Sequence, residues 1–229
     1  MGGQACVLYG GAEFSRDVDL AVMMEPKNLA RLREVLRDLD AECIAVPPFE
    51  ARFLDMGLAV HFRCRHAETK DMRIDIMSRM RGVSPFSQLW DRRTTLEIDG
   101  EAIDVLSLPD LVQAKKTQRD KDWPMISRLL EAHYFQNKAE AAALQVFFWF
   151  REMRTASLLV DLGQNFPAEC EHVLPQRSLL AFAKEGDESA LAHALKEEET
   201  REREADRQYW LPLKRELERL RIAARGNKN

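Results

Sequence analysis

The first twenty residues, Met1 to Leu20, read MGGQACVLYGGAEFSRDVDL and contain the pattern from which the rest of the fold follows. Asp17 and Asp19 flank Val18 at the start of an apolar run, which predicts a strand over residues 17–23. Side chains two positions apart on a strand point to the same face, so the two carboxylates are expected side by side. Two adjacent like charges are costly unless a cation neutralises them, so the pair indicates a cation site.

Two pairs of glycines precede these aspartates. Residues without a Cβ let backbone N–H groups approach a phosphate closely, which makes Gly2 and Gly3 candidates for phosphate contact. The segment from Gly3 to the predicted strand is long enough for a helical crossover. Ser15 stands two positions before the first aspartate, where its hydroxyl can reach the same phosphate pocket. The second pair, Gly10-Gly11, is expected to form the turn before the strand.

The chain up to about residue 120 mixes strand and helix patterns. Asp99-Gly100 lies between two alternating segments and predicts a β-hairpin. Ser107 is expected to cap the next helix, with Asp110 three residues later in capping-box position. This mixture predicts an α/β or α+β layered domain. The further expected elements are a helix over 27–40, strands over 43–46, 58–63 and 72–77, and hairpin arms over 95–98 and 102–106.

A third carboxylate, Asp75, lies in the apolar strand pattern of residues 72–77. Completing a metal site with Asp17 and Asp19 would explain it, and it could also accept a proton from an attacking hydroxyl. Asp104 is a rival, but it belongs to a hairpin arm beyond the third strand. Carboxylate oxygens favour Mg²⁺ over Zn²⁺. Two such ions about 4 Å apart would stabilise the attacking and leaving oxygens of a phosphoryl or nucleotidyl transfer.

The remainder of the chain predicts helices. A strongly apolar helix is expected over 139–162, ended by Gly163. Mixed charges from residue 196 onward indicate a solvated helix face. A boundary near 135–140 divides the chain into predicted domains 1–135 and 136–229. Shorter helices are expected over 122–134, 178–183 and 189–198.

Composition excludes several protein classes. The 229 residues are 45% hydrophobic and 31% charged with a net charge of −4, which argues against a disordered chain and a globally basic nucleic-acid binder. The four cysteines form no Cys-x-x-Cys pair, and His61, Cys64 and His66 fit no common zinc spacing. No signal peptide is recognised, and the most apolar stretch, 139–150, is too short to span a bilayer. The expected setting is the reducing cytoplasm, with no membrane partner.

The motifs together resemble the nucleotidyltransferase (DNA polymerase β-like) superfamily. The resemblance covers residues 1 to about 135. Within the superfamily, the motifs are most similar to those of the small prokaryotic branch, which includes abortive-infection and toxin–antitoxin-type members. The residues that carry it are Gly2-Gly3, Asp17-Val18-Asp19-Leu20, Ile74-Asp75-Ile76, Leu106 to Leu111 followed by Lys115 and Lys116, and Arg119 to Asp122. Two departures stand out. The family's strand before the glycine pair is missing or truncated here, and position 3 is Gly where Ser is common.

The resemblance implies a nucleotidyltransferase-like mixed sheet with flanking helices, followed by a helical C-terminal region. It implies transfer of a nucleoside monophosphate from an NTP to a hydroxyl of RNA, protein or a small molecule, with two Mg²⁺ ions and a toxin-like role. One lysine would meet the phosphates, and the family position favours Lys115 over Lys116. The implied catalytic and metal-binding residues are Asp17, Asp19 and Asp75, and the implied nucleotide-binding residues are Gly2, Gly3, Ser15 and Lys115.

Two alternatives remain. The first is a catalytically decayed binding or regulatory protein on the same fold, which the missing strand and Gly3 favour. The second is a helical partner-binding protein, in which the tail of residues 196–229 contacts a protein partner or forms a homo-oligomer.

Overall fold

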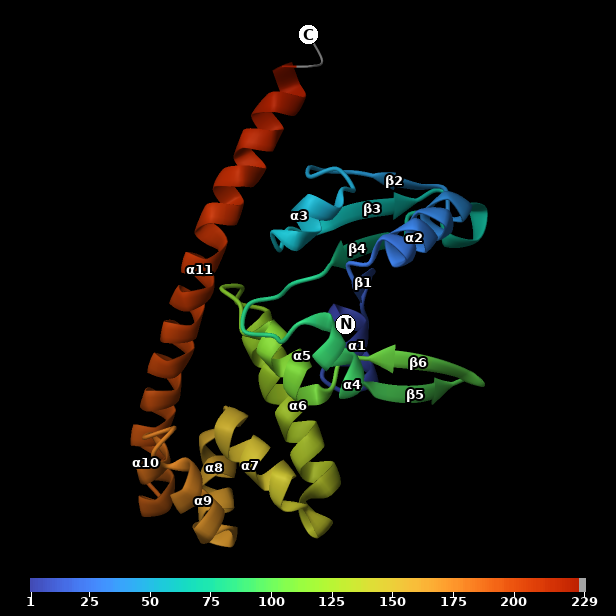
Figure 1. Cartoon of the computed structure of the whole chain (residues 1–229). Helices are drawn as coiled ribbons and strands as arrows, with labels where there is room; N and C mark the ends of the chain where they lie inside the picture. Colours follow the sequence, from blue (N-terminus) through green and yellow to red (C-terminus); the bar gives the residue numbers. More distant parts are fainter. Residues whose placement is uncertain (227–229) are drawn as a thin grey trace. The chain divides into compact units, whose positions relative to one another are not determined.

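A mixed four-stranded sheet carries the predicted aspartates (Figure 1). The computed structural model describes residues 1–226. The strands are β1 (Asp17–Ala21), β2 (Ala41–Cys43), β3 (Val60–Cys64) and β4 (Arg73–Met77), in the order β1-β4-β3-β2. β1 and β4 run parallel, and the other neighbours are antiparallel. The predicted strands over 17–23, 58–63 and 72–77 are confirmed in place, whereas the one predicted over 43–46 is misplaced, because β2 shares only Cys43 with it.

The sheet belongs to the first of two compact units, which comprises residues 1–8, 13–114 and the described residues from 207 onward. Helix α2 (Pro26–Asp38) begins at a proline, which suits the first helical turn, and supplies Leu29 and Leu36 to the core on one sheet face. Ile74 and Ile76 of β4 point into that core. Because strand side chains alternate, Arg73 and Asp75 are left on the opposite face.

The remaining elements of the first unit are mostly short. The hairpin of β5 (Thr94–Ile98) and β6 (Glu101–Val105) is confirmed, with its turn at Asp99-Gly100. Ser107 caps α5 (Leu108–Lys115) as predicted: its Oγ accepts the Asp110 N–H at 3.4 Å and donates to an Asp110 carboxylate oxygen at 2.7 Å. The other elements here are α1 (Gly2–Leu8), α3 (Ala51–Asp55), η1 (Ala67–Thr69) and α4 (Phe86–Asp91).

Helix α11 (Glu188–Gly226) contributes to both units. In the first unit, Leu213 packs with Phe53 and Leu58. The prediction of a separate helix over 189–198 is wrong in extent, because α11 continues through the charged tail with Pro212 inside it.

The second unit, residues 9–12 and 115–206, contains helices in its larger segment. Its core includes Trp149, Phe150 and Leu162, all fully buried. The predicted helices over 122–134 and 178–183 are confirmed in place, and the predicted domain boundary near 135–140 lies inside this unit. Its helices are α6 (Asp122–Asn137), η2 (Lys138–Glu140), α7 (Ala143–Glu152), α8 (Ala156–Asn165), α9 (Pro167–Val173), α10 (Leu180–Glu185) and the first part of α11.

The prediction of one helix over 139–162 is wrong, because the helix is interrupted between α7 and α8. The buried Arg177 guanidinium donates to the carbonyl oxygens of Phe150 and Met153, at 2.8 and 3.0 Å. These bonds satisfy carbonyls that the end of α7 leaves without helical partners. Gly163 does not end the helix either. It lies within α8, where an added Cβ would be 3.3 Å from the carbonyl oxygen of Ala183.

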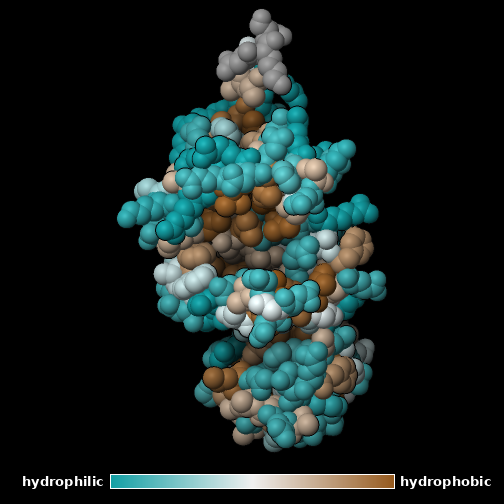
Figure 2. Space-filling view, turned by 90° about the vertical axis from the view of Figure 1, so that its right-hand side faces the viewer, coloured by the Kyte–Doolittle hydropathy of each residue, from teal (hydrophilic) through white to brown (hydrophobic). Residues whose placement is uncertain are grey.

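Surface chemistry is mixed. Figure 2 shows one face on which hydrophobic residues gather in a central patch with hydrophilic residues around it. Within residues 1–226, no helix combines the length and hydrophobicity that a membrane crossing requires.

Candidate functional site

The face of the sheet opposite α2 is polar and brings the three predicted aspartates together. Asp19 of β1 lies in register with Asp75 of β4, and Asp75 in turn lies opposite His61 of β3. Two residues earlier on β1, on the same face, Asp17 lies in register with Arg73. Strand neighbours in register are about 5 Å apart, so these side chains form one continuous polar surface.

Asp75 is the most enclosed member of this surface. Arg73 donates from Nε to one Asp75 oxygen at 2.9 Å and from Nη2 to the other at 3.0 Å. His61 Nδ1 lies 2.8 Å from Oδ1 of the same carboxylate. Burial raises the pKa of Asp75, but the hydrogen bonds from His61 and Arg73 outweigh it and hold that pKa below its ordinary value. Asp75 is therefore ionised and held by two neighbours.

Arg73 and His61 belong to this surface, although neither was expected there from the sequence. Arg73 stands two positions before Asp75, and this same-face spacing is the signal that could have found it. Its pKa is raised, first by the Asp75 hydrogen bond and also by the charges of Asp75, Asp17 and Asp19. The positive charge of Arg73 is bonded to Asp75 and is also stabilised by the charges of Asp17 and Asp19.

The glycine pair and Ser15 lie against the aspartates, as predicted from the spacing. The Gly3 N–H donates to Asp19 Oδ2 at 3.1 Å. A Cβ added at Gly2 would lie 1.9 Å from that oxygen, and one added at Gly3 would lie 2.3 Å from the Ser15 hydroxyl. The Ser15 hydroxyl donates to the Asp17 carbonyl at 3.1 Å. Only residues without side chains fit here.

Lys115 lies in the second unit. It is almost buried, with Nζ 3.7 Å from an oxygen of the fully buried Asp122. Arg119 Nε donates to the other Asp122 oxygen at 2.8 Å. Lys116 pairs with Glu152 at 2.8 Å. Both lysines therefore have carboxylate partners, and the phosphate contact of Lys115 stays a prediction.

The alternative residues have other partners. Asp104, the rival of Asp75, lies in the separate two-stranded sheet, where it accepts from Thr95 at 2.6 Å and pairs with Arg93 at 3.0 Å. Cys64 is buried in the core on the α2 face, whereas His61 lies on the polar face, so these two do not converge on a zinc ion.

Two of the three aspartates on the polar face have the chemistry of Mg²⁺ ligands. Asp17 and Asp19 are half-buried carboxylates on one face of β1, and such hard oxygen ligands fit Mg²⁺. Asp75 is already bound by Arg73 and His61. In the part of the chain that the structure describes, no three His, Cys, Asp or Glu side chains are arranged to hold a metal ion. The fit to Mg²⁺ therefore rests on Asp17 and Asp19.

No protein-family model and no curated protein sequence matches the chain. Among solved structures, it is similar to an antigenic nucleotidyltransferase-like protein from Paracoccidioides brasiliensis, with 17% identity over 61% of this chain and 78% of that chain. The TM-score is 0.32. A likeness of this size does not assign chemistry, so any function has to be argued from the polar face itself.

Proposed function

We propose that this chain is a Mg²⁺-dependent nucleotidyltransferase that transfers a nucleoside monophosphate from an NTP to a hydroxyl acceptor. The observation that carries the proposal is the register of β1 and β4, which aligns Asp19 with Asp75 beside Asp17 and next to Gly2 and Gly3 at the start of α1. Carboxylates on one sheet face beside a glycine backbone suit a metal–triphosphate ligand.

Each residue has a distinct part in this reaction. Asp17 and Asp19 would hold Mg²⁺, and the bound metal would neutralise charge on the transferring phosphate. Gly2, Gly3 and Ser15 lie directly against the two aspartates, so a triphosphate bound to that metal would pass beside them. The acceptor oxygen forms a bond to the α-phosphorus while the bond to the leaving pyrophosphate breaks, and the hydroxyl proton leaves to solvent water.

Asp75 has a different part. Its lowered pKa makes it a weak proton acceptor, so we assign it to electrostatic organisation of the site rather than to the role of base. In this proposal Lys115 supports the phosphates, and the carboxylates of Asp17 and Asp19 would also hold a second Mg²⁺. The acceptor is an RNA, protein or small-molecule hydroxyl, as in toxin-type enzymes. The setting is a reducing cytoplasm, which suits the four free cysteines.

The test compares Asp17→Asn and Asp19→Asn with the matched control Asp104→Asn. Calorimetry measures binding of each Mg²⁺–NTP, and pyrophosphate release in the presence of RNA or protein extract measures turnover. We expect both site variants to lose at least about tenfold in Mg²⁺-dependent NTP binding, the scale of a lost charge-assisted contact, while the control keeps it. Equal NTP binding by the site variants and the control would refute the proposal.

One observation favours a second candidate, a nucleotide-binding protein without turnover. The two hydrogen bonds from Arg73 neutralise Asp75, the third carboxylate of the expected metal site. The same experiment separates the candidates. Asp17-dependent NTP binding without pyrophosphate release from any NTP supports the non-catalytic protein, whereas release that depends on Asp17 supports the transferase.

A further inference from the structure

The second unit contains a cavity of about 390 Å³ that the proposed transferase reaction does not use. It lies between the start of α6, the beginning of α8 and the first part of α11, and we call it the Trp123 pocket. Its volume falls in the range of small-molecule sites. Trp123 is nearly buried and is fixed by a 2.8 Å hydrogen bond from its Nε1 to the Thr117 carbonyl oxygen. Pro124 and Leu195 add further apolar lining.

Three cations line this pocket. The guanidinium carbons of Arg154 and Arg203 lie 5.2 and 5.7 Å from the Trp123 ring centroid. The Arg154 side chain is 7% exposed and pairs with Glu198 at 2.6 Å. The Nε atoms of Arg154 and Arg203 are buried without a hydrogen-bond partner. Lys196 is the third cation, and it is well exposed at the rim.

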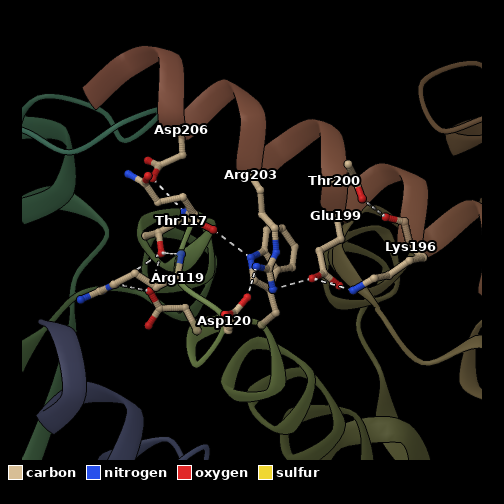
Figure 3. A network of polar contacts seen from close by, with 11 residues as sticks. Thr117, Arg119, Asp120, Lys196, Glu199, Thr200, Arg203 and Asp206 are labelled. Atoms are coloured by element: carbon tan, nitrogen blue, oxygen red, sulfur yellow. Dashed lines mark hydrogen bonds and ion pairs between the residues drawn. The ribbon is translucent and has the colours of Figure 1, made fainter. Parts of the chain in front are cut away.

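The partner of Arg203 at the pocket mouth is weakly held. Figure 3 shows Asp120 and Glu199 on the Arg203 guanidinium, with Lys196 beside Glu199. The Asp120 side chain is 96% exposed, so its pair with Arg203 is a solvent-screened surface contact. An anion from solution can therefore replace the Asp120 carboxylate without leaving a buried charge unpaired.

Charge and shape together define what fits. With Asp120 in place, the pocket lining has three cations and two carboxylates. With Asp120 swung into solvent, Arg154 keeps its pair with Glu198, while Arg203 and Lys196 share Glu199 and retain one excess positive charge. A phosphate monoester, with close to two negative charges and three free oxygens, can bond to both Arg203 and Lys196 at once. The apolar side of the pocket, with Trp123, Pro124 and Leu195, suits a carbon group attached to that phosphate.

We propose that the Trp123 pocket binds a small organic phosphate monoester, whose phosphate replaces the Asp120 carboxylate against Arg203 and Lys196. The carbon part of the ligand then lies along Trp123 and Leu195. Asp120 acts as a built-in competitor that occupies the anion position while the ligand is absent. This site is independent of Asp17 and Asp19 and of the reaction proposed for them.

The test measures phenyl phosphate binding to the full chain by calorimetry. Asp120→Asn removes the competitor and should tighten binding by about twofold to fivefold, the factor that an exposed ion pair contributes. Lys196→Gln should weaken binding by a similar factor. Asp38→Asn and Lys27→Gln, exposed residues of α2, are matched controls that should leave the affinity unchanged.

Ligand comparisons complete the experiment. Inorganic phosphate should bind more weakly than phenyl phosphate because it lacks the apolar part, and phenol should not bind measurably. Benzoate, with one charge, should also bind more weakly. The proposal is overturned if phenyl phosphate does not bind the wild type or Asp120→Asn, or if Asp120→Asn binds no more tightly than the wild type. It is equally overturned if inorganic phosphate or benzoate binds as tightly as phenyl phosphate.

Discussion

Replacing Gly2 by alanine tests whether the glycine turn and Asp19 are one structural unit. Gly2 has a φ of +65°, and an added Cβ would lie 1.9 Å from Asp19 Oδ2 and 2.2 Å from its Cγ. Real Cβ contacts do not fall below 3.0 Å, so the carboxylate has to move away. That movement breaks the 3.1 Å hydrogen bond that Asp19 accepts from the Gly3 N–H.

The expected loss has two parts. A side chain at positive φ costs about 1 kcal/mol. Loss of a hydrogen bond to a charged group costs roughly 1.5–3 kcal/mol. The free energy of unfolding of Gly2→Ala should therefore fall by about 2.5–4 kcal/mol in urea titrations followed by circular dichroism, and Mg²⁺-dependent NTP binding should weaken with it.

Gly100→Ala is the matched control. Gly100 has a φ of +84°, and an added Cβ there meets no atom within 4 Å. This variant should lose only the conformational part, about 1 kcal/mol, and should keep its NTP binding. If Gly2→Ala and Gly100→Ala lose the same stability, or if Gly2→Ala keeps full NTP binding, then the turn does not position Asp19 and the reasoning fails.

Three further predictions concern the second unit. Phe150→Ala should lower the free energy of unfolding by about 3–5 kcal/mol because Phe150 is fully buried; a loss below about 1 kcal/mol in urea titration would contradict the described core. Gly163→Ala should destabilise by roughly 1 kcal/mol despite alanine's better helix propensity, since its Cβ would be 3.3 Å from the Ala183 carbonyl oxygen; a raised melting temperature would contradict that close approach. Burial lowers the pKa of His133 below 6.5, and the Trp149 indole Nε1 donates to its Nδ1 at 2.9 Å. Just below pH 6.5, folded His133 therefore stays neutral while the same histidine in the unfolded chain takes up a proton. Its contribution to stability is complete above about pH 6.5 and is lost as the pH falls from there toward the folded pKa, so urea midpoints should drop from pH 7.5 to 5.5 by less in a His133→Gln variant.

Local sequence patterns were sufficient for most of the first unit. The strands follow from short alternating runs, the hairpin from Asp99-Gly100, and the start of α5 from Ser107. Each of these signals is contained within a few neighbouring residues, so no distant part of the chain is needed to read it.

The errors arose where distant residues decide the local structure. The apolar pattern through residues 139–162 is continuous, yet the helix is interrupted after Glu152. At that point Arg177 binds the carbonyl oxygens of Phe150 and Met153. Gly163 resembles a helix end but serves a close approach to Ala183. The hydrophobic periodicity of the helices does not reveal either contact.

The candidate site shows the same division. The shared face of Asp17 and Asp19 follows from their spacing alone. The alignment of Asp19 with Asp75 depends on strand pairing, which the sequence suggests only through the resemblance it carries. The pairing of His61 with Asp75 depends on the antiparallel register of β3, which cannot be read from either strand separately.

The division of the sheet into a charged face and an apolar face also bears on how the protein reaches its folded state. If β1 paired with β4 one residue out of place, Asp17 and Asp19 would enter the core that α2 covers, while Val18 and Leu20 would turn to water. Such an arrangement would bury two uncompensated charges and is strongly disfavoured. Asp17 and Asp19 are costly to place side by side. The same two carboxylates therefore also disfavour misaligned pairing of β1 with β4 during folding.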